Sequence, residues 1–322
     1  MNLESKIEKV KDILENKKVC VAFSGGADSS LIAYLARAVC SEVLAVTIDN
    51  NILPPNFIED TKDFCKKYDI KQEIIFEDFY KHKDIISNNH DRCFLCRNEM
   101  YKHITATARE NDIHIIVDGT NISDLIEDRP GILINYKNNI KSPFVEANLC
   151  SKEIHEYLNK NNIPYSHSTT CLATRLPFGC ELTDDKYERI SKAEEIIYEN
   201  SNVKIAKVRQ DKTNAIVEVD NIDELIKDNR LSLINEQLKA LGYGKVTLNL
   251  EPINDDKEIR IKYENNQFEY QLPYEIDIEK TDIKSKNIKI EKTGLVKGSG
   301  FDNYKEAEEE FMNILPKIRR KI

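Results

Sequence analysis

The stretch VCVAFSGGADSSLIAYLA, residues 19–36, constrains the fold more than any other part of the chain. An apolar run of strand length leads directly into Gly25 and Gly26, and a helical pattern follows. Two glycines let the backbone turn tightly with its N–H groups exposed, and the start of a helix adds further free N–H groups. The stretch therefore predicts a strand, an anion-binding loop and a helix, in that order.

The rest of the first half repeats this alternation of short apolar runs and helical patterns. Further strands are expected at 42–49, 72–76 and 113–120, with helices near 56–69 and 97–110. Such alternation predicts βαβ units, a parallel sheet and helices on both of its faces. The fold class is therefore α/β.

The pattern changes after Gly179. A helix over 184–199, a hairpin across DKTN and a helix over 222–240 predict a small α+β unit. The runs EIRIKY, EYQLPYEI and NIKIEKTGLV then predict strands, and YKEAEEEFMNIL predicts a terminal helix. We therefore expect three domains, with an α/β domain over 1–179, an α+β domain over 180–256 and a β-rich extension over 257–322.

Composition excludes some classes of protein. Hydrophobic residues make up 40% and charged residues 32% of the 322 residues, which is typical of a soluble globular protein. No apolar run reaches the ~20 residues that span a bilayer, and the N-terminus lacks the apolar core of a signal peptide. We therefore expect a cytoplasmic protein with reduced thiols. A net charge of −9 argues against a broad nucleic-acid surface, although a local basic groove is compatible with it.

The glycine loop indicates a nucleotide ligand. Its free amides, together with the hydroxyls of Ser24 and Ser29, would surround an anion. Asp28 in the same loop would repel phosphate unless Mg²⁺ lay between the two. The loop therefore predicts ATP with Mg²⁺, and the alternative is a glycine turn that only joins strand to helix.

Polar residues follow two other predicted strands, where open α/β sheets bind their ligands. In VDGTNISD, Asp118 could hold metal at the ATP site, while Asn121 and Asp124 could contact substrate. A helix-capping role for Asp124 fits the pattern equally well. Asp49, at the end of the strand 42–49, is expected near the adenine or ribose of ATP.

Three of the 8 cysteines form a candidate site. Cys93 and Cys96 form a C-x-x-C just ahead of a predicted helix and beside two arginines, which lower thiol pKa values. A redox dithiol is one interpretation. A structural zinc is another, but it would need two more ligands, and the pattern offers none. Cys171 in the loop CLATRLPFG could be the third partner, which makes a 4Fe–4S cluster with one open iron plausible. Cys20, Cys40 and Cys65 fit buried core positions instead.

The loop SGGADSS resembles the PP-loop of the ATP pyrophosphatase superfamily, whose members split ATP between its α and β phosphates. Together with RCFLCR, DGTNISD, SPFVEANLCSKEI and CLATRLPFG, it resembles the LarE family of pyridinium-3,5-biscarboxylic acid mononucleotide sulfur transferases over roughly residues 1–250. That resemblance implies adenylation of a carboxylate of the mononucleotide and its conversion to a thiocarboxylate. The product serves the synthesis of the nickel-pincer nucleotide cofactor.

The resemblance also implies roles for individual residues. Cys93, Cys96 and Cys171 would hold a 4Fe–4S cluster that carries an extra sulfide. In family members without the C-x-x-C, the cysteine matching Cys171 gives up its own sulfur and becomes dehydroalanine, and this route stays open here. Arg175 would neutralise the substrate phosphate or the developing oxyanion, and its alternative is a surface ion pair. The resemblance further implies a sulfur donor and a homo-oligomer.

Arg209 and Glu218 match positions near the family's substrate-phosphate site. Here the motif reads RQDKTNAI, which keeps the arginine but lacks the family's histidine, glycine and second arginine. Two other functions stay open. One is a tRNA 2-thiouridine enzyme, and the other is a nucleotide-binding regulatory protein with a structural zinc.

Overall fold

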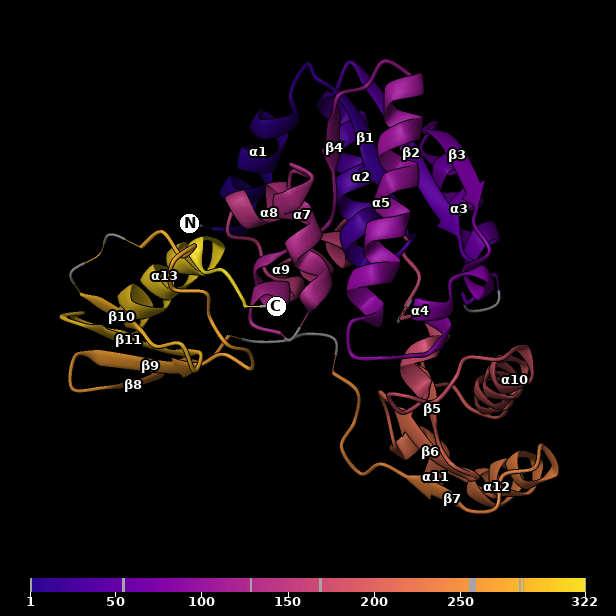
Figure 1. Cartoon of the computed structure of the whole chain (residues 1–322). Coiled ribbons are helices and arrows are strands. Elements are labelled where there is room, and N and C mark those ends of the chain that lie inside the picture. The colour runs from indigo at the N-terminus through magenta and orange to yellow at the C-terminus, as the bar shows by residue number, and fades with distance from the viewer. Residues whose placement is uncertain are drawn as a thin grey trace.

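The computed structural model describes residues 2–53, 56–127, 129–167, 170–254, 259–283, 285 and 287–321. These residues form a main α/β part and two smaller lobes, each with its own sheet (Figure 1). The domain boundary expected between residues 256 and 257 lies outside the described residues. None of the described helices combines the length and the apolar character needed to cross a membrane.

The main sheet has four parallel strands in the order β3-β2-β1-β4. They are β1 (Lys18–Ala22), β2 (Glu42–Asp49), β3 (Lys71–Phe76) and β4 (Ile115–Val117). The central strands β1 and β2 are buried along their length, as expected for near-continuous apolar runs covered on both faces. The α/β fold class predicted from the alternation is therefore confirmed.

Helices cover both faces of this sheet (Figure 1). On one face, Val19 and Val21 pack in a cluster with side chains from several helices, which are α1 (Leu3–Leu14), α2 (Ala27–Val39), α3 (Phe57–Lys67) and α9 (Ser151–Lys160). On the other face, Cys20 packs with α5 (Arg92–Glu110) and α7 (Leu133–Lys137). Alternate residues of β1 thus face opposite layers, since side chains alternate along a strand.

Short helical segments complete the main part. They are η1 (Phe79–Lys81), α4 (Lys83–Ile86), α6 (Ile122–Leu125), η2 (Pro130–Ile132), α8 (Pro143–Glu146) and η3 (Leu172–Arg175). The segments η3 and α6 carry residues of the two candidate sites described below. Both are too short to be stable alone, so their positions depend on tertiary contacts.

The second sheet has the order β5-β6-β7, from β5 (Ala206–Asp211), β6 (Asn214–Val219) and β7 (Val246–Leu248). The expected hairpin is present, and α10 (Asp184–Asn200) packs against it. The single helix expected over 222–240 is wrong. The structure has α11 (Asp223–Ile226) and α12 (Arg230–Ala240) instead, because Asp228 takes a left-handed conformation that a continuous helix cannot contain.

The third sheet is antiparallel, in the order β10-β11-β9-β8, and α13 (Tyr304–Ile314) packs on it before η4 (Leu315–Lys317). Its strands are β8 (Lys262–Glu264), β9 (Gln267–Gln271), β10 (Ile288–Ile290) and β11 (Leu295–Ser299). The one strand expected over NIKIEKTGLV is wrong, because the chain reverses between β10 and β11. Gly294 makes the reversal with φ +92°, where a Cβ atom would lie 2.6 Å from the carbonyl oxygens of Leu272 and Tyr274.

Candidate functional site

The glycine loop lies at the carboxyl end of β1 and leads into α2, as predicted. Gly25 has φ +71°, a conformation that favours glycine, and Gly26 is the N-cap of α2. The Ser24 and Ser29 hydroxyl oxygens lie 3.1 Å apart, and Ser29 Oγ also accepts from the Ser24 N–H at 3.2 Å. The structure therefore places both hydroxyls beside the free amides of a helix start, an arrangement that suits a phosphate.

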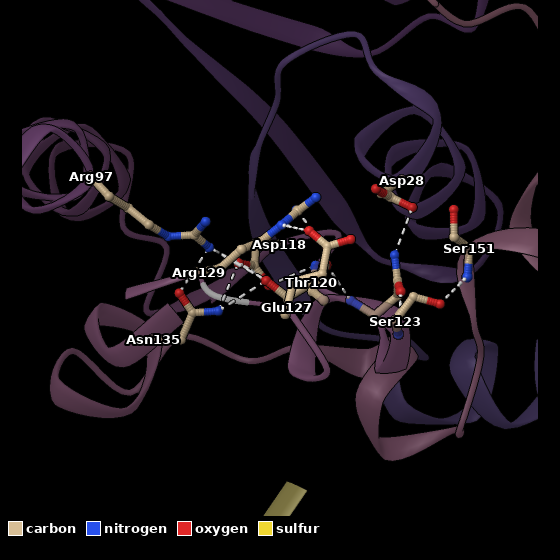
Figure 2. Close-up of polar contacts among 11 residues, drawn as sticks. Asp28, Arg97, Asp118, Thr120, Ser123, Glu127, Arg129, Asn135 and Ser151 are labelled. Atoms are coloured by element: carbon tan, nitrogen blue, oxygen red, sulfur yellow. Dashed lines mark hydrogen bonds and ion pairs between the residues drawn. The ribbon is translucent and has the colours of Figure 1, made fainter. Parts of the chain in front are cut away.

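Asp28 stands in the first turn of α2, directly against the DGTNISD segment. Asn121 donates from Nδ2 to Asp28 Oδ1 at 3.0 Å (Figure 2). The approach of the two segments requires Gly119, because a Cβ atom there would lie 2.7 Å from the Asp28 carbonyl carbon. The structure thus brings the predicted residues Asp28 and Asn121 into direct contact.

The charges around Asp28 favour its neutral form. Burial and then the neighbouring Asp124 carboxylate raise the pKa of Asp28 to about 8, against the opposing effects of Arg129 and the Asn121 hydrogen bond. Arg129 forms an ion pair with Asp124 at 2.5 Å, while Asp124 also caps α6 by accepting from the Asn121 N–H at 2.9 Å. A bound divalent cation would reverse this balance and favour the Asp28 carboxylate.

Asp118 lies at the end of β4 in a dense polar network (Figure 2). Its carboxylate accepts from five side chains, which are Arg97 at 2.5 Å, Thr120 at 2.7 Å, Asn135 at 2.8 Å, Ser142 at 2.8 Å and Tyr101 at 3.0 Å. These donors occupy both carboxylate oxygens, so Asp118 fixes the edge of the sheet in this state. Its predicted role at the ATP site stays a prediction.

Asp49 ends β2 and is partly buried. Its carboxylate accepts from the Asn51 N–H at 3.3 Å, which shapes the turn after the strand. The expected contact with the adenine or ribose stays a prediction.

The C-x-x-C lies within α5, which begins at Arg92, so the expectation that it precedes the helix is wrong. Residues three apart lie on the same side of a helix, so Cys93 and Cys96 can serve a single site. The buried guanidinium of Arg92 donates to Cys93 Sγ at 3.2 Å and to the Ala173 carbonyl at 3.0 Å. The Ala173 N–H in turn donates to Cys171 Sγ at 3.3 Å. These hydrogen bonds connect the C-x-x-C to the Cys171 loop.

The three thiols are near enough to affect one another electrostatically. Burial raises the pKa of Cys96, and the Cys171 and Cys93 thiols raise it further. Burial also raises the pKa of Cys171, while the Ala173 N–H and Arg92 oppose the shift. Among the described residues, however, no group of three or more His, Cys, Asp or Glu side chains is arranged to hold a metal ion. The thiols therefore share one region without the geometry of a formed metal site.

A phenol completes this region. Tyr187 of α10 is buried, and its hydroxyl has no hydrogen-bond partner among the described residues. Cys171 is the neighbour with the largest electrostatic effect on Tyr187, and Cys96 contributes as well. A buried hydroxyl without a partner costs free energy, so an acceptor placed among the thiols would satisfy it.

Arg175 is buried rather than on the surface, so the alternative of a surface ion pair is excluded. Its Nε donates to Glu194 of α10 at 2.6 Å, and its Nη1 donates to the hydroxyls of Thr170 and Thr174 at 2.7 and 2.9 Å. Arg175 thus attaches the Cys171 loop to the second lobe. Its proposed catalytic role stays a prediction.

Arg209 and Glu218 face each other across the β5–β6 hairpin. Arg209 Nε donates to both Glu218 carboxylate oxygens at 2.8 and 2.9 Å, and its Nη1 donates to the Thr174 carbonyl at 2.7 Å. The pair therefore lies against the Cys171 loop. Substrate binding by the pair stays a prediction.

Several residues of these sites were not singled out from the sequence, among them Gly119, Arg129, Tyr187 and Glu194. Gly119 stands inside the DGTNISD motif, and a glycine at that place could have been taken as a sign of close backbone contact. Arg129 and Glu194 occupy charged positions that resemble ordinary solvent-facing ones, and only the structure shows what they pair with.

A family profile described as a PP-loop domain matches residues 1–137. An uncharacterized protein of Methanocaldococcus jannaschii is 32% identical over 244 residues, which cover 75% of this chain and 93% of that protein. An uncharacterized protein of Synechocystis is 27% identical over 80% of this chain and 98% of its own length. The pyridinium-3,5-bisthiocarboxylic acid mononucleotide synthase of Lactiplantibacillus plantarum is 23% identical over 73% of this chain and 86% of its own length. The loop geometry and these matches agree that the chain belongs to the PP-loop family of ATP-using enzymes.

Proposed function

We propose that this protein is an ATP-dependent sulfur transferase whose substrate is the pyridinium-3,5-biscarboxylic acid mononucleotide. A single observation carries the proposal, namely the hydrogen-bond chain from Cys93 through Arg92 and Ala173 to Cys171. It joins two cysteine segments that are far apart in sequence. Cys96 in the same cysteine region is adjacent to Arg97, which contacts the end of β4 beside the ATP loop. A sulfur source beside an ATP site is what such a reaction needs.

The reaction has two steps. A substrate carboxylate oxygen attacks the α-phosphorus of ATP, so that pyrophosphate leaves and an acyl adenylate forms. A sulfur nucleophile then attacks the acyl carbon, and the C–O bond to AMP breaks to give the thiocarboxylate. Mg²⁺ fits the carboxylate of Asp28, because Mg²⁺ takes one or two carboxylates and completes its coordination with phosphates and water.

The cysteine region could supply the sulfur in either of two ways. Three thiolates suit a 4Fe–4S cluster, whose open iron could hold an extra sulfide. The Tyr187 hydroxyl, which has no partner among the described residues, supports a bound group in this region that can accept its hydrogen bond. In the sacrificial alternative, the Cys171 thiolate attacks the acyl carbon of the adenylate and displaces AMP, which gives a thioester. Removal of the Cα proton of Cys171 and cleavage of its Cβ–S bond then leave dehydroalanine in the protein and release the thiocarboxylate.

The test uses full-length protein purified without oxygen. Iron, acid-labile sulfide and zinc are measured first, and the protein is then given Mg·ATP and the pyridinium dicarboxylate mononucleotide. We expect AMP, pyrophosphate and a thiocarboxylate detected by mass spectrometry. Bulk tRNA offered in place of the mononucleotide should yield no thiolated nucleoside. Thiolated tRNA would contradict the proposal, as would zinc alone without any thiocarboxylate.

Cys171→Ala should lower thiocarboxylate formation by about 100-fold or more while ATP binding stays within about twofold. Cys180→Ala is the matched control, because Cys180 packs against the same hydrophobic cluster but bonds only weakly to the Glu181 carbonyl, at 3.9 Å. A Cys171→Ala protein as active as the control would refute the assignment. Mass spectrometry of the protein after turnover separates the two sulfur routes, because only the sacrificial one leaves dehydroalanine.

A further inference from the structure

The hydrophobic core of the third lobe includes side chains from the main part. Ile122 and Leu125 of α6 are buried in the same cluster as Phe268, Phe311 and Ile314 of the C-terminal lobe. The four residues of α6 would be unstable alone, so this packing contributes to holding the segment in place.

Two polar contacts reinforce the packing. The Tyr274 hydroxyl donates to the Leu125 carbonyl at 2.6 Å. The Arg319 guanidinium lies over the Tyr136 ring of α7, 3.9 Å from its centroid. Both contacts reach residues that immediately follow site residues, because Leu125 follows Asp124 and Tyr136 follows Asn135.

These contacts lead directly to the ATP site. Asn121, the N-cap of α6, donates to Asp28, and Asp124 in the same helix has the largest electrostatic effect on Asp28 after burial. Asn135 of α7 donates to Asp118 at 2.8 Å. The C-terminal lobe thus contacts both segments that set the geometry of the acidic residues near the loop.

We infer that the C-terminal lobe is a positioning element of the ATP site, and that Tyr274 is its principal positioning residue. The Tyr274 hydrogen bond fixes the backbone of α6, which in turn fixes Asn121 and Asp124 against Asp28. This inference rests on the ATP-binding part of the proposed function and does not depend on which substrate receives the sulfur.

The lobe offers a matched pair of tyrosines for the test. Tyr274→Phe removes the hydroxyl that reaches α6, whereas Tyr263→Phe removes one that donates to the Phe301 carbonyl at 2.8 Å within the lobe. Each substitution deletes one hydrogen bond from a tyrosine hydroxyl to a backbone carbonyl. If the lobe only stabilises the fold, both variants should behave alike.

The measurement is calorimetric binding of a non-hydrolysable Mg·ATP analogue to full-length protein, with Tm recorded alongside. We expect Tyr274→Phe to raise Kd by about threefold to tenfold, while Tyr263→Phe leaves Kd at the parental value despite a similar change in Tm. Arg319→Met, which removes the contact with α7, should also raise Kd. Equal Kd values for both tyrosine variants would overturn the inference. Parental protein that binds the analogue but forms no thiocarboxylate would count against the proposed function alone, because this inference concerns only the binding of ATP.

Discussion

The ATP loop and the cysteine region differ in how complete they are. Around the loop, Asp118 is fully hydrogen-bonded and Asp28 has a fixed partner in Asn121. Around the cysteines, the Tyr187 hydroxyl has no partner within the described part of the chain, and the thiols described there are not arranged as a metal site. The comparison indicates that the half around the ATP loop is preformed, whereas the cysteine half, under the proposed function, is completed by what it binds.

The largest expected effect comes from the preformed half. Asp28→Asn should lower AMP formation by about 100-fold or more, because a Mg²⁺ ion that loses its carboxylate ligand gives up several kcal/mol of transition-state stabilisation. Iron content should not change. Asp60→Asn is the control, since Asp60 is exposed and, within the described ranges, its carboxylate accepts from Ser166 beside the same loop. AMP formation at the parental rate in Asp28→Asn would mean that the loop is not the catalytic ATP site.

The junction between the Cys171 loop and the second lobe should be nearly as sensitive. Arg175→Gln leaves Glu194 buried without its cation, so we expect a loss of about 3–5 kcal/mol in the free energy of unfolding. Arg37→Gln breaks an exposed pair with Asp69 and should cost less than about 1 kcal/mol. Urea denaturation checks both variants. Equal losses in the two variants would show that the buried pair stabilises the protein no more than the exposed pair does.

Titration of Asp28 should appear in the stability of the nucleotide-free protein. Its pKa is about 8 in the folded state, against 3.8 for an ordinary aspartate, so the folded state binds more protons than the unfolded state between these two pH values. Stability is therefore fully present at low pH and falls as the pH rises toward 8. The free energy of unfolding of the parental protein, relative to Asp28→Asn, should be higher at pH 5.5 than at pH 8. A difference independent of pH would contradict the neutral form of Asp28.

The smallest expected effect is a change in the free energy of unfolding that has opposite signs in the two halves. Tyr101→Phe removes a hydroxyl bonded to Asp118 and should destabilise the protein by about 1 kcal/mol. Tyr187→Phe removes a buried hydroxyl that has no partner in the described structure, so it should stabilise the protein without metal by up to about 1 kcal/mol. The same variant should retain less iron and sulfide after anaerobic loading. If Tyr187→Phe destabilises as Tyr101→Phe does, the cysteine half is as complete as the ATP half.

The sequence allowed the parallel sheet and the glycine loop to be predicted, because apolar periodicity and two glycines determine both locally. The start of α5 was missed because its first turn, RCFLC, lacks a clear apolar face. Asp91 is the N-cap, but its side chain makes no capping hydrogen bond. The break at Asp228 was missed because a single left-handed residue leaves little trace in periodicity.

Contacts over long sequence distances were harder still. No pattern in the sequence pairs Arg175 with Glu194 or Tyr274 with Leu125, which are 149 residues apart. Such pairs form when helices and strands pack together, and the sequence pattern of each element by itself does not say which elements will meet. The candidate residues were therefore predictable by type, whereas their partners were not.

Cys96 and Arg97 are neighbours on one helix, yet Cys96 lies beside Cys171 whereas Arg97 binds Asp118 at the edge of the main sheet. A helix turns about 100° per residue, so a single residue inserted between them would rotate Cys93 and Cys96 away from Cys171 while Arg97 stayed bound to Asp118. The spacing of these two residues therefore couples the position of the thiols to that of the sheet edge.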